Sequence, residues 1–204
     1  MRRLAILAGL FIAISIPAGA QSLPKFELFG GYTYTHFTAS DSASGHTNGW
    51  SVAPAFYPLK FLGVVFDLGG DDAKGYKQSD GSMVDAGIHS YRALIGPRFR
   101  IRVGRYVPFA DFVVGGVYRG TETNSADYHD STTGDPVPAG TELAKAQFNI
   151  AYAADGGIDY RLLRRLYVRG QVGWLHSDYT VTNAAIADPI QNSLTVSGGV
   201  VFGF

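Results

Sequence analysis

The sequence of 204 residues contains no cysteine, which excludes disulfides, thiolate-bound metals and cysteine nucleophiles together. Charge of either sign is not in excess: 17 basic residues balance 17 acidic ones, so no bulk attraction to nucleic acid is expected. Long apolar runs are also missing beyond residue 20. If this part of the chain crosses a membrane, it must do so as strands of a closed barrel, because only helices and closed barrels satisfy every backbone group in lipid.

The one apolar run lies at the start of the chain. Two arginines precede the apolar stretch 4–16, and Ala18-Gly19-Ala20 follows it with the small-x-small form that signal peptidase requires. At about 13 residues the run is short of the ~20 that a membrane-spanning helix needs. We therefore expect residues 1–20 to be a cleavable secretory signal peptide and residues 21–204 to form a single domain.

Glycine, aromatic residues and alternation are what the remaining chain has in quantity. It carries most of the 26 glycines, and 13% of the sequence is aromatic. Eight segments place apolar residues at every second position, which is the side-chain period of a β-strand. Most of them match the about 9–11 residues of a tilted membrane strand better than the ~5–6 of a soluble one. The segments are residues 25–37, 49–57, 62–69, 89–100, 110–118, 145–161, 166–176 and 193–204.

The connections between the segments alternate in length. Residues 57–61, 101–106 and 161–165 are short turns, whereas the intervening connections are long and rich in Gly, Ser, Thr, Asn and Asp. Short turns at one end and long external loops at the other are typical of transmembrane barrels. We predict an all-β fold, an eight-stranded antiparallel up-and-down transmembrane β-barrel. The long connections are residues 38–48, 70–88, 119–143 and 177–192.

The two faces of the segments differ in charge. In a membrane barrel the apolar face meets lipid and the charged face fills the lumen, where eight strands leave room for little more than side chains. Because buried charges need partners, we expect a plug of paired charges, and the alternative is a conducting lumen lined by the same residues. The charged face carries Glu27, Asp67, Arg92, Arg98, Asp111, Lys145, Asp155, Asp159 and Arg169.

Aromatic residues gather at both ends of the apolar face, as in the aromatic girdles of membrane barrels. A soluble lipocalin-like carrier, with the apolar face inward, is the alternative. Pro54 and Pro97 each remove a ladder donor, so we expect bulges there. The loop-end set is Tyr32, Tyr34, Trp50, Tyr91, Tyr118 and Trp174, and the turn-end set is Phe56, Phe99, Tyr160, Phe202 and Phe204.

Several motifs resemble those of the small porin-like, OmpA/OmpX-type outer-membrane β-barrel proteins. They are Phe29-Gly30-Gly31-Tyr32-Thr33-Tyr34, Gly96-Pro97-Arg98-Phe99 and Gly156-Gly157-Ile158-Asp159-Tyr160-Arg161. At the end of the chain, Val200, Phe202 and Phe204 look like the signal read by the outer-membrane assembly machinery. The resemblance implies Sec export, signal-peptide cleavage and residence in the outer membrane of a Gram-negative-type bacterium. It implies no single activity, because members differ in function.

Only one local set of residues suggests hydrolysis. His176-Ser177-Asp178 lies at the loop end of its segment, where lipid A deacylase barrels place a His and a Ser. Adjacent strand residues point to opposite faces, so His176 and Ser177 cannot pair without a bend, and we do not expect an enzyme. The other histidines are dispersed in sequence, so no metal site or cofactor is expected. They are His36, His46, His89 and His129.

The long connections are acidic and the turns are basic. We expect a monomer with a structural or surface-interaction role exerted through long acidic extracellular loops, in contact with outer-membrane lipid and lipopolysaccharide and not with nucleic acid. A narrow porin-like channel is the first alternative, and an outer-leaflet lipid-modifying enzyme is the second. The acidic residues include Asp41, Asp71, Asp72, Asp80, Asp85, Glu122, Asp127, Asp130, Asp135, Glu142, Asp178 and Asp188; the turn residues are Lys60, Arg102, Arg105, Arg164 and Arg165.

Overall fold

A computed structural model describes residues 23–39, 44–77, 83–123, 138, 142–177 and 190–204. These residues form eight strands, and within them no helix is long and apolar enough to cross a membrane. The strands are β1 (Phe26–Ala39), β2 (Ser44–Phe56), β3 (Leu62–Lys77), β4 (Met83–Arg100), β5 (Tyr106–Thr123), β6 (Glu142–Arg161), β7 (Leu166–Ser177) and β8 (Ile190–Gly203).

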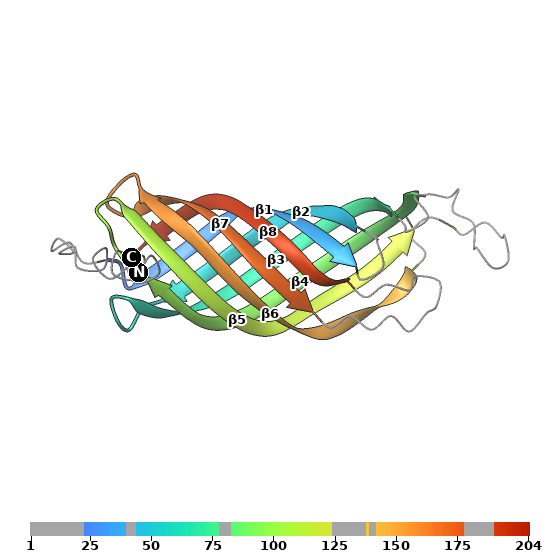
Figure 1. The fold of residues 1–204 in the computed structure, drawn as a ribbon, viewed down its shortest axis with the longest axis horizontal. Coiled ribbons are helices and arrows are strands. Elements are labelled where there is room, and N and C mark those ends of the chain that lie inside the picture. Colours follow the sequence, from blue (N-terminus) through green and yellow to red (C-terminus); the bar gives the residue numbers. More distant parts are fainter. Residues whose placement is uncertain (1–22, 40–43, 78–82, 124–137, 139–141, 178–189) are drawn as a thin grey trace, which may run out of the picture.

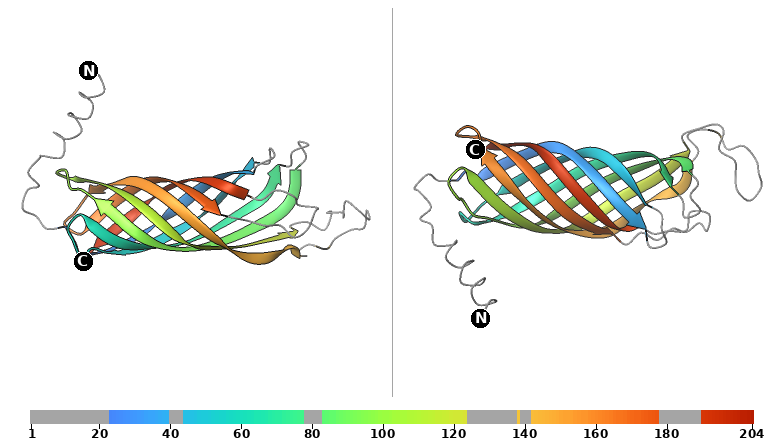
Figure 2. Two further views of the ribbon diagram at one scale, coloured as in Figure 1. Left: turned by 60° about the horizontal axis from the view of Figure 1, so that its bottom comes forward. Right: turned by 45° about the horizontal axis from the view of Figure 1, so that its top comes forward.

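Each strand pairs antiparallel with the next, and β8 returns to pair with β1, so the sheet closes into a barrel. The predicted eight-stranded antiparallel up-and-down barrel is confirmed. Figures 1 and 2 show the strands winding obliquely around an elongated cylinder, with the three short turns and the C-terminus at one end. We call this the turn end, and the opposite end the loop end.

Several strands are longer than the alternation predicted. Residues 70–77, 83–88 and 119–123 were expected in long connections, but they continue β3, β4 and β5. Pairs such as Asp71↔Ser90 and Gly87↔Glu122 extend the ladder there. The alternation of apolar residues ends before the hydrogen bonding between strands does, because the part of a strand that extends beyond the lipid needs no apolar outer face. The other described parts of the predicted connections, residues 38–39, 44–48, 142–143, 177 and 190–192, likewise belong to strands. Apart from residue 138, the rest of these connections lies outside the described residues.

Buried and exposed positions alternate along most of the strand residues whose side chains the structure describes, and β7 shows this most plainly, with a change at each residue from 167 to 175. The exposed face is the apolar one. The girdle residues point outward, with Tyr32 and Trp50 about half exposed at the loop end and Phe99 at the turn end, while Tyr160 is half-buried. A belt of exposed aliphatic side chains separates the two sets. It includes Val64, Ile95, Val114, Val172 and Val196.

The prediction of bulges at Pro54 and Pro97 is wrong. The pairing of β1 with β2 runs unbroken through Leu28↔Pro54, and that of β3 with β4 through Val64↔Pro97. On the other side of each proline the ladder lapses for two residues and resumes in the same register. Each proline therefore leaves its gap toward a single neighbouring strand, and no extra residue is needed.

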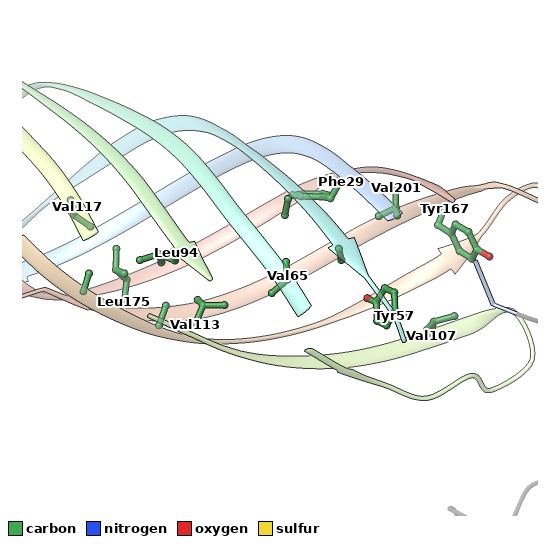
Figure 3. Close-up of a cluster of buried hydrophobic side chains, with 14 residues drawn as sticks. Phe29, Tyr57, Val65, Leu94, Val107, Val113, Val117, Tyr167, Leu175 and Val201 are labelled. Atoms are coloured by element: carbon green, nitrogen blue, oxygen red, sulfur yellow. The ribbon is translucent and has the colours of Figure 1, made fainter. Parts of the chain in front are cut away.

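The barrel interior is filled partly by apolar side chains. Figure 3 shows them spread along the lumen, from Val117 at one end to Val107 at the other. Two inward rings occupy space left by glycines on neighbouring strands: a Cβ at Gly199 of β8 would lie 2.8 Å from the Phe29 ring, and one at Gly157 of β6 would lie 2.6 Å from the Phe109 ring. Small residues and large rings therefore alternate to fill the lumen, and they leave defined places for the charged groups.

Candidate functional site: the charged interior

The strand alternation places the predicted charged residues inside the barrel. Asp155 is half-buried, and for Lys145 the side chain lies outside the described part of the structure. The others are buried, each with no more than 8% of its surface exposed. They are Glu27, Asp67, Arg92, Arg98, Asp111, Asp159 and Arg169.

Two ion pairs join residues directly opposite each other on neighbouring strands. Arg98 of β4 faces Asp111 of β5, donating from Nε to Oδ1 at 2.6 Å and from Nη2 to Oδ2. Arg169 of β7 faces Asp159 of β6 in the same way, at 2.7 Å and 2.8 Å. Both pairs have the two-bond fork geometry that makes arginine–carboxylate contacts strong and specific.

Glu27 joins the Arg169–Asp159 pair to Arg100 and Tyr57 at the turn end of the lumen. Its Oε1 accepts a hydrogen bond from Nη1 of Arg100, and its Oε2 accepts one from the Tyr57 hydroxyl at 3.0 Å. Nη2 of Arg169 lies 3.7 Å from the same Oε2. Arg100 also donates to the backbone oxygen of Pro24 at 2.7 Å. One carboxylate from β1 thus contacts groups from β4, β7 and the β2–β3 turn.

Aromatic rings complete this layer. The guanidinium carbons of Arg98 and Arg169 lie 4.5 Å and 4.2 Å from the centre of the Phe109 ring, and that of Arg100 lies 3.2 Å from the centre of Tyr57. Such cation–π contacts are most favourable where water is excluded. The turn-end half of the lumen is therefore occupied by guanidinium groups held between rings and carboxylates, which we call the turn-end plug.

A second charged group lies nearer the loop end. Arg92 sits between two aspartates of β3, with Nε 3.3 Å from Asp67 and Nη1 3.0 Å from Asp71. The Ser51 hydroxyl donates to Asp67 at 3.4 Å. Asp71 was predicted to lie in a loop, and so was Arg119, but both are buried within the barrel. The longer strands account for this correction, since they carry the inward face beyond the apolar band.

The predicted charge network did not include Tyr57, Asp71, Arg100 or Arg119, all of which are buried inside the barrel. Arg100 could have been found, because it has the same parity as Arg98 on its strand. Tyr57 could have been found in the same way, because it lies two residues after the inward Ala55, although it belongs to a turn. Asp71 and Arg119 gave no such signal, because the apolar alternation has ended on their strands.

The remaining candidates lie apart from this interior. His176 is on the outer face, with its ring 5.8 Å from that of Trp174 and its Nδ1 3.1 Å from the side-chain oxygen of Asn192, whereas Ser177 is buried. His89 is also exposed and lies 2.5 Å from Asp72. Among the described residues no three acidic or histidine side chains gather as metal ligands. Asp178 and His129 lie outside the described residues.

No family model matches the sequence, and no curated protein matches it. Solved structures match over almost the whole chain. OprG from Pseudomonas aeruginosa has a TM-score of 0.62 at 13% identity, covering 90% of this chain and 97% of OprG.

The chain has the fold of the small eight-stranded outer-membrane β-barrels. Neisserial surface protein A aligns with a TM-score of 0.58 at 11% identity, covering 90% of this chain and 100% of that one. Ail of Yersinia pestis gives the same TM-score at 12% identity, covering 89% and 99%. At these identities the likeness establishes the fold and not an activity. The predicted resemblance to small outer-membrane barrels is confirmed at that level.

The ion pairs predict a specific pattern of stability. Arg98→Met should destabilise the folded barrel by about 3–5 kcal/mol, because it leaves Asp111 buried without its partner. The double variant Arg98→Met/Asp111→Leu should recover most of that loss, since no charge then remains uncompensated. Denaturant unfolding in lipid vesicles would measure both. Arg105→Met in an exposed turn is the control, and equal stability of Arg98→Met and this control would contradict the pairing.

Proposed function

We propose that this protein is a non-catalytic outer-membrane barrel that does not conduct ions and that acts through its surface at the loop end. The observation that carries the proposal is the turn-end plug, in which Glu27, Arg98, Arg100, Asp159 and Arg169 join strands from around the barrel. A passing ion would have to separate such pairs, and leaving a buried charge without its partner costs about 3–5 kcal/mol. Since the lumen is closed in this way, the loops are left to carry the function.

The location follows from features that agree with one another. The expected signal peptide at residues 1–20 would export the chain, and the outward, exposed Val200, Phe202 and Phe204 fit an assembly signal at the end of β8. The exposed apolar belt between two aromatic girdles suits a strand barrel in lipid and would be unfavourable in water. These features support the outer membrane of a Gram-negative-type bacterium, with lipid and lipopolysaccharide around the barrel.

The loops indicate the chemistry of a partner. Ail has been crystallised with sucrose octasulfate, a heparin analogue, which is a polyanion. The connections of this chain are instead acidic, with Asp127, Asp130 and Asp135 in the longest one. Acidic loops attract basic surfaces and repel polyanions. The partner class we propose is therefore a cationic one.

A narrow channel is the second candidate. It is favoured by Asp155, which is half-buried in the lumen and belongs to no ion pair within 4.0 Å among the described residues. The lipid-modifying enzyme has less support. Its candidate base and nucleophile, His176 and Ser177, lie on opposite faces of β7, with Ser177 buried.

Planar-bilayer recording tests whether the lumen conducts. The folded protein should give no steady openings, because the turn-end plug blocks the path. The double variant Arg169→Ser/Asp159→Ser should give small steady openings, since it removes one complete pair. Steady openings of the unmodified protein, with a conductance that changes in Arg92→Ala or Asp155→Asn, would establish the channel and overturn the plugged barrel.

Binding of a cationic polypeptide tests the surface role. Vesicles of zwitterionic lipid that carry the folded protein should bind poly-L-lysine, and the binding should weaken as salt is added, because exposed charges are screened. Asp127→Asn/Asp130→Asn/Asp135→Asn should lose most of this binding. The control is Arg164→Gln/Arg165→Gln, which changes charge at the turn end and should bind like the unmodified protein. Equal binding by the loop variant or by empty vesicles would refute the proposed surface.

A further inference from the structure

Asp155 is set apart from the other carboxylates inside the barrel. It lies on β6, opposite Asp111 of β5 and Gly173 of β7. Five interior carboxylates each lie within 4.0 Å of an arginine nitrogen, and they are Glu27, Asp67, Asp71, Asp111 and Asp159. In the described part of the chain Asp155 has no such partner. The residue opposite it on β5, Asp111, is another acid that is already bound to Arg98.

Gly173 provides the space into which this carboxylate extends. A Cβ built at Gly173 would overlap Oδ1 of Asp155 and would lie 2.8 Å from Oγ1 of Thr195 on β8. The Asp155 side chain therefore reaches across β7 toward β8. Its oxygen and the Thr195 hydroxyl approach the same point, close enough to contact a single bound ion or water.

Other oxygen atoms on the inward faces of β7, β1 and β2 lack hydrogen-bond partners. Gln171 lies two residues before Gly173 on the same inward face; it is 8% exposed, and its Oε1 has no hydrogen-bond partner. The row that starts at Asp155 continues through Thr195 to Thr35 and then Thr47, whose buried hydroxyls also have none. Buried polar groups without partners are rare in folded proteins and indicate a bound water or ion.

We propose that the lumen binds a monovalent alkali cation, K⁺ or Na⁺, through the Asp155 carboxylate, the Thr195 hydroxyl and the Gln171 side-chain oxygen. Bound water would link this site to the hydroxyls of Thr35 and Thr47. The ligands are all oxygen atoms, which suit a hard cation. A single carboxylate supplies a single negative charge, so one monovalent ion neutralises it.

A divalent ion fits this site less well. Ca²⁺ takes six to eight oxygen ligands and usually more than one carboxylate. The neighbouring Asp67 and Asp111 are bound by Arg92 and Arg98 and are therefore not free to turn toward Asp155. The turn-end plug lies on the turn-end side of the site. The ion would therefore enter from the loop end and remain at the site without passing through the barrel.

Thermal unfolding of the full folded barrel in lipid vesicles tests the site, with KCl or NaCl compared with N-methyl-D-glucamine chloride at equal ionic strength. The small cations should raise the unfolding midpoint by about 2–4 °C, in a concentration-dependent way. Asp155→Asn should abolish the difference. Identical midpoints of the unmodified protein in all three salts would overturn the proposal and would mean that Asp155 is neutralised by a proton instead.

Two further variants keep the test decisive if Asp155→Asn does not fold. Thr195→Val keeps the charge and removes one ligand, so it should weaken the cation effect without abolishing folding. Gly173→Ala should displace the carboxylate and reduce the same effect. Asp72→Asn, which alters an acid on the outer face beside His89, is the control and should leave the cation effect unchanged. An unaltered effect in Thr195→Val and Gly173→Ala would place the ion elsewhere and contradict the assignment.

Discussion

The pairing of β1 with β8 is the constraint on which the rest of this structure depends. A strand barrel in lipid has no water to satisfy an open edge, so its first and last strands must meet. Here they pair from Glu27↔Gly203 to Thr38↔Asn192 without a shift of register, and Phe204 adds a bond from its N–H to the Phe26 oxygen at 2.9 Å. Closure with eight strands fixes a narrow lumen, and the narrow lumen determines what the charged residues can do.

Within that lumen, charge and size are balanced strand by strand. Arg98 and Arg169 each pair with a carboxylate directly opposite on the neighbouring strand, and both guanidinium groups lie against the Phe109 ring. Glycines leave room for other charged side chains, as Gly69 does for Arg92 and Gly173 does for Asp155. The arrangement supports both proposals, a lumen closed by the turn-end plug and a cation site on the loop-end side of that plug.

Alternation predicted the number of strands, the barrel and the inward position of the charged residues, because a half-apolar strand must show its period in the sequence. It could not predict where β3 and β5 end, since Asp71 and Arg119 lie beyond the apolar band. Nor could it predict partners: the pairing of Arg98 with Asp111 and the bridging by Glu27 depend on register across strands. The bulge predicted at Pro54 was wrong because the sequence does not show that the proline interrupts pairing with only one of its two neighbouring strands.

Closure of the barrel can be measured directly because the chain has no cysteine of its own. Thr33 of β1 and Ser197 of β8 are opposite each other, with their hydroxyl oxygens 2.9 Å apart. Thr33→Cys/Ser197→Cys should form an intramolecular disulfide in the membrane-folded protein, whereas Thr33→Cys/Ser193→Cys should not, because those positions are too far apart. Failure of the first pair to close, or its closure only between two chains, would contradict the β1–β8 junction and the barrel built on it.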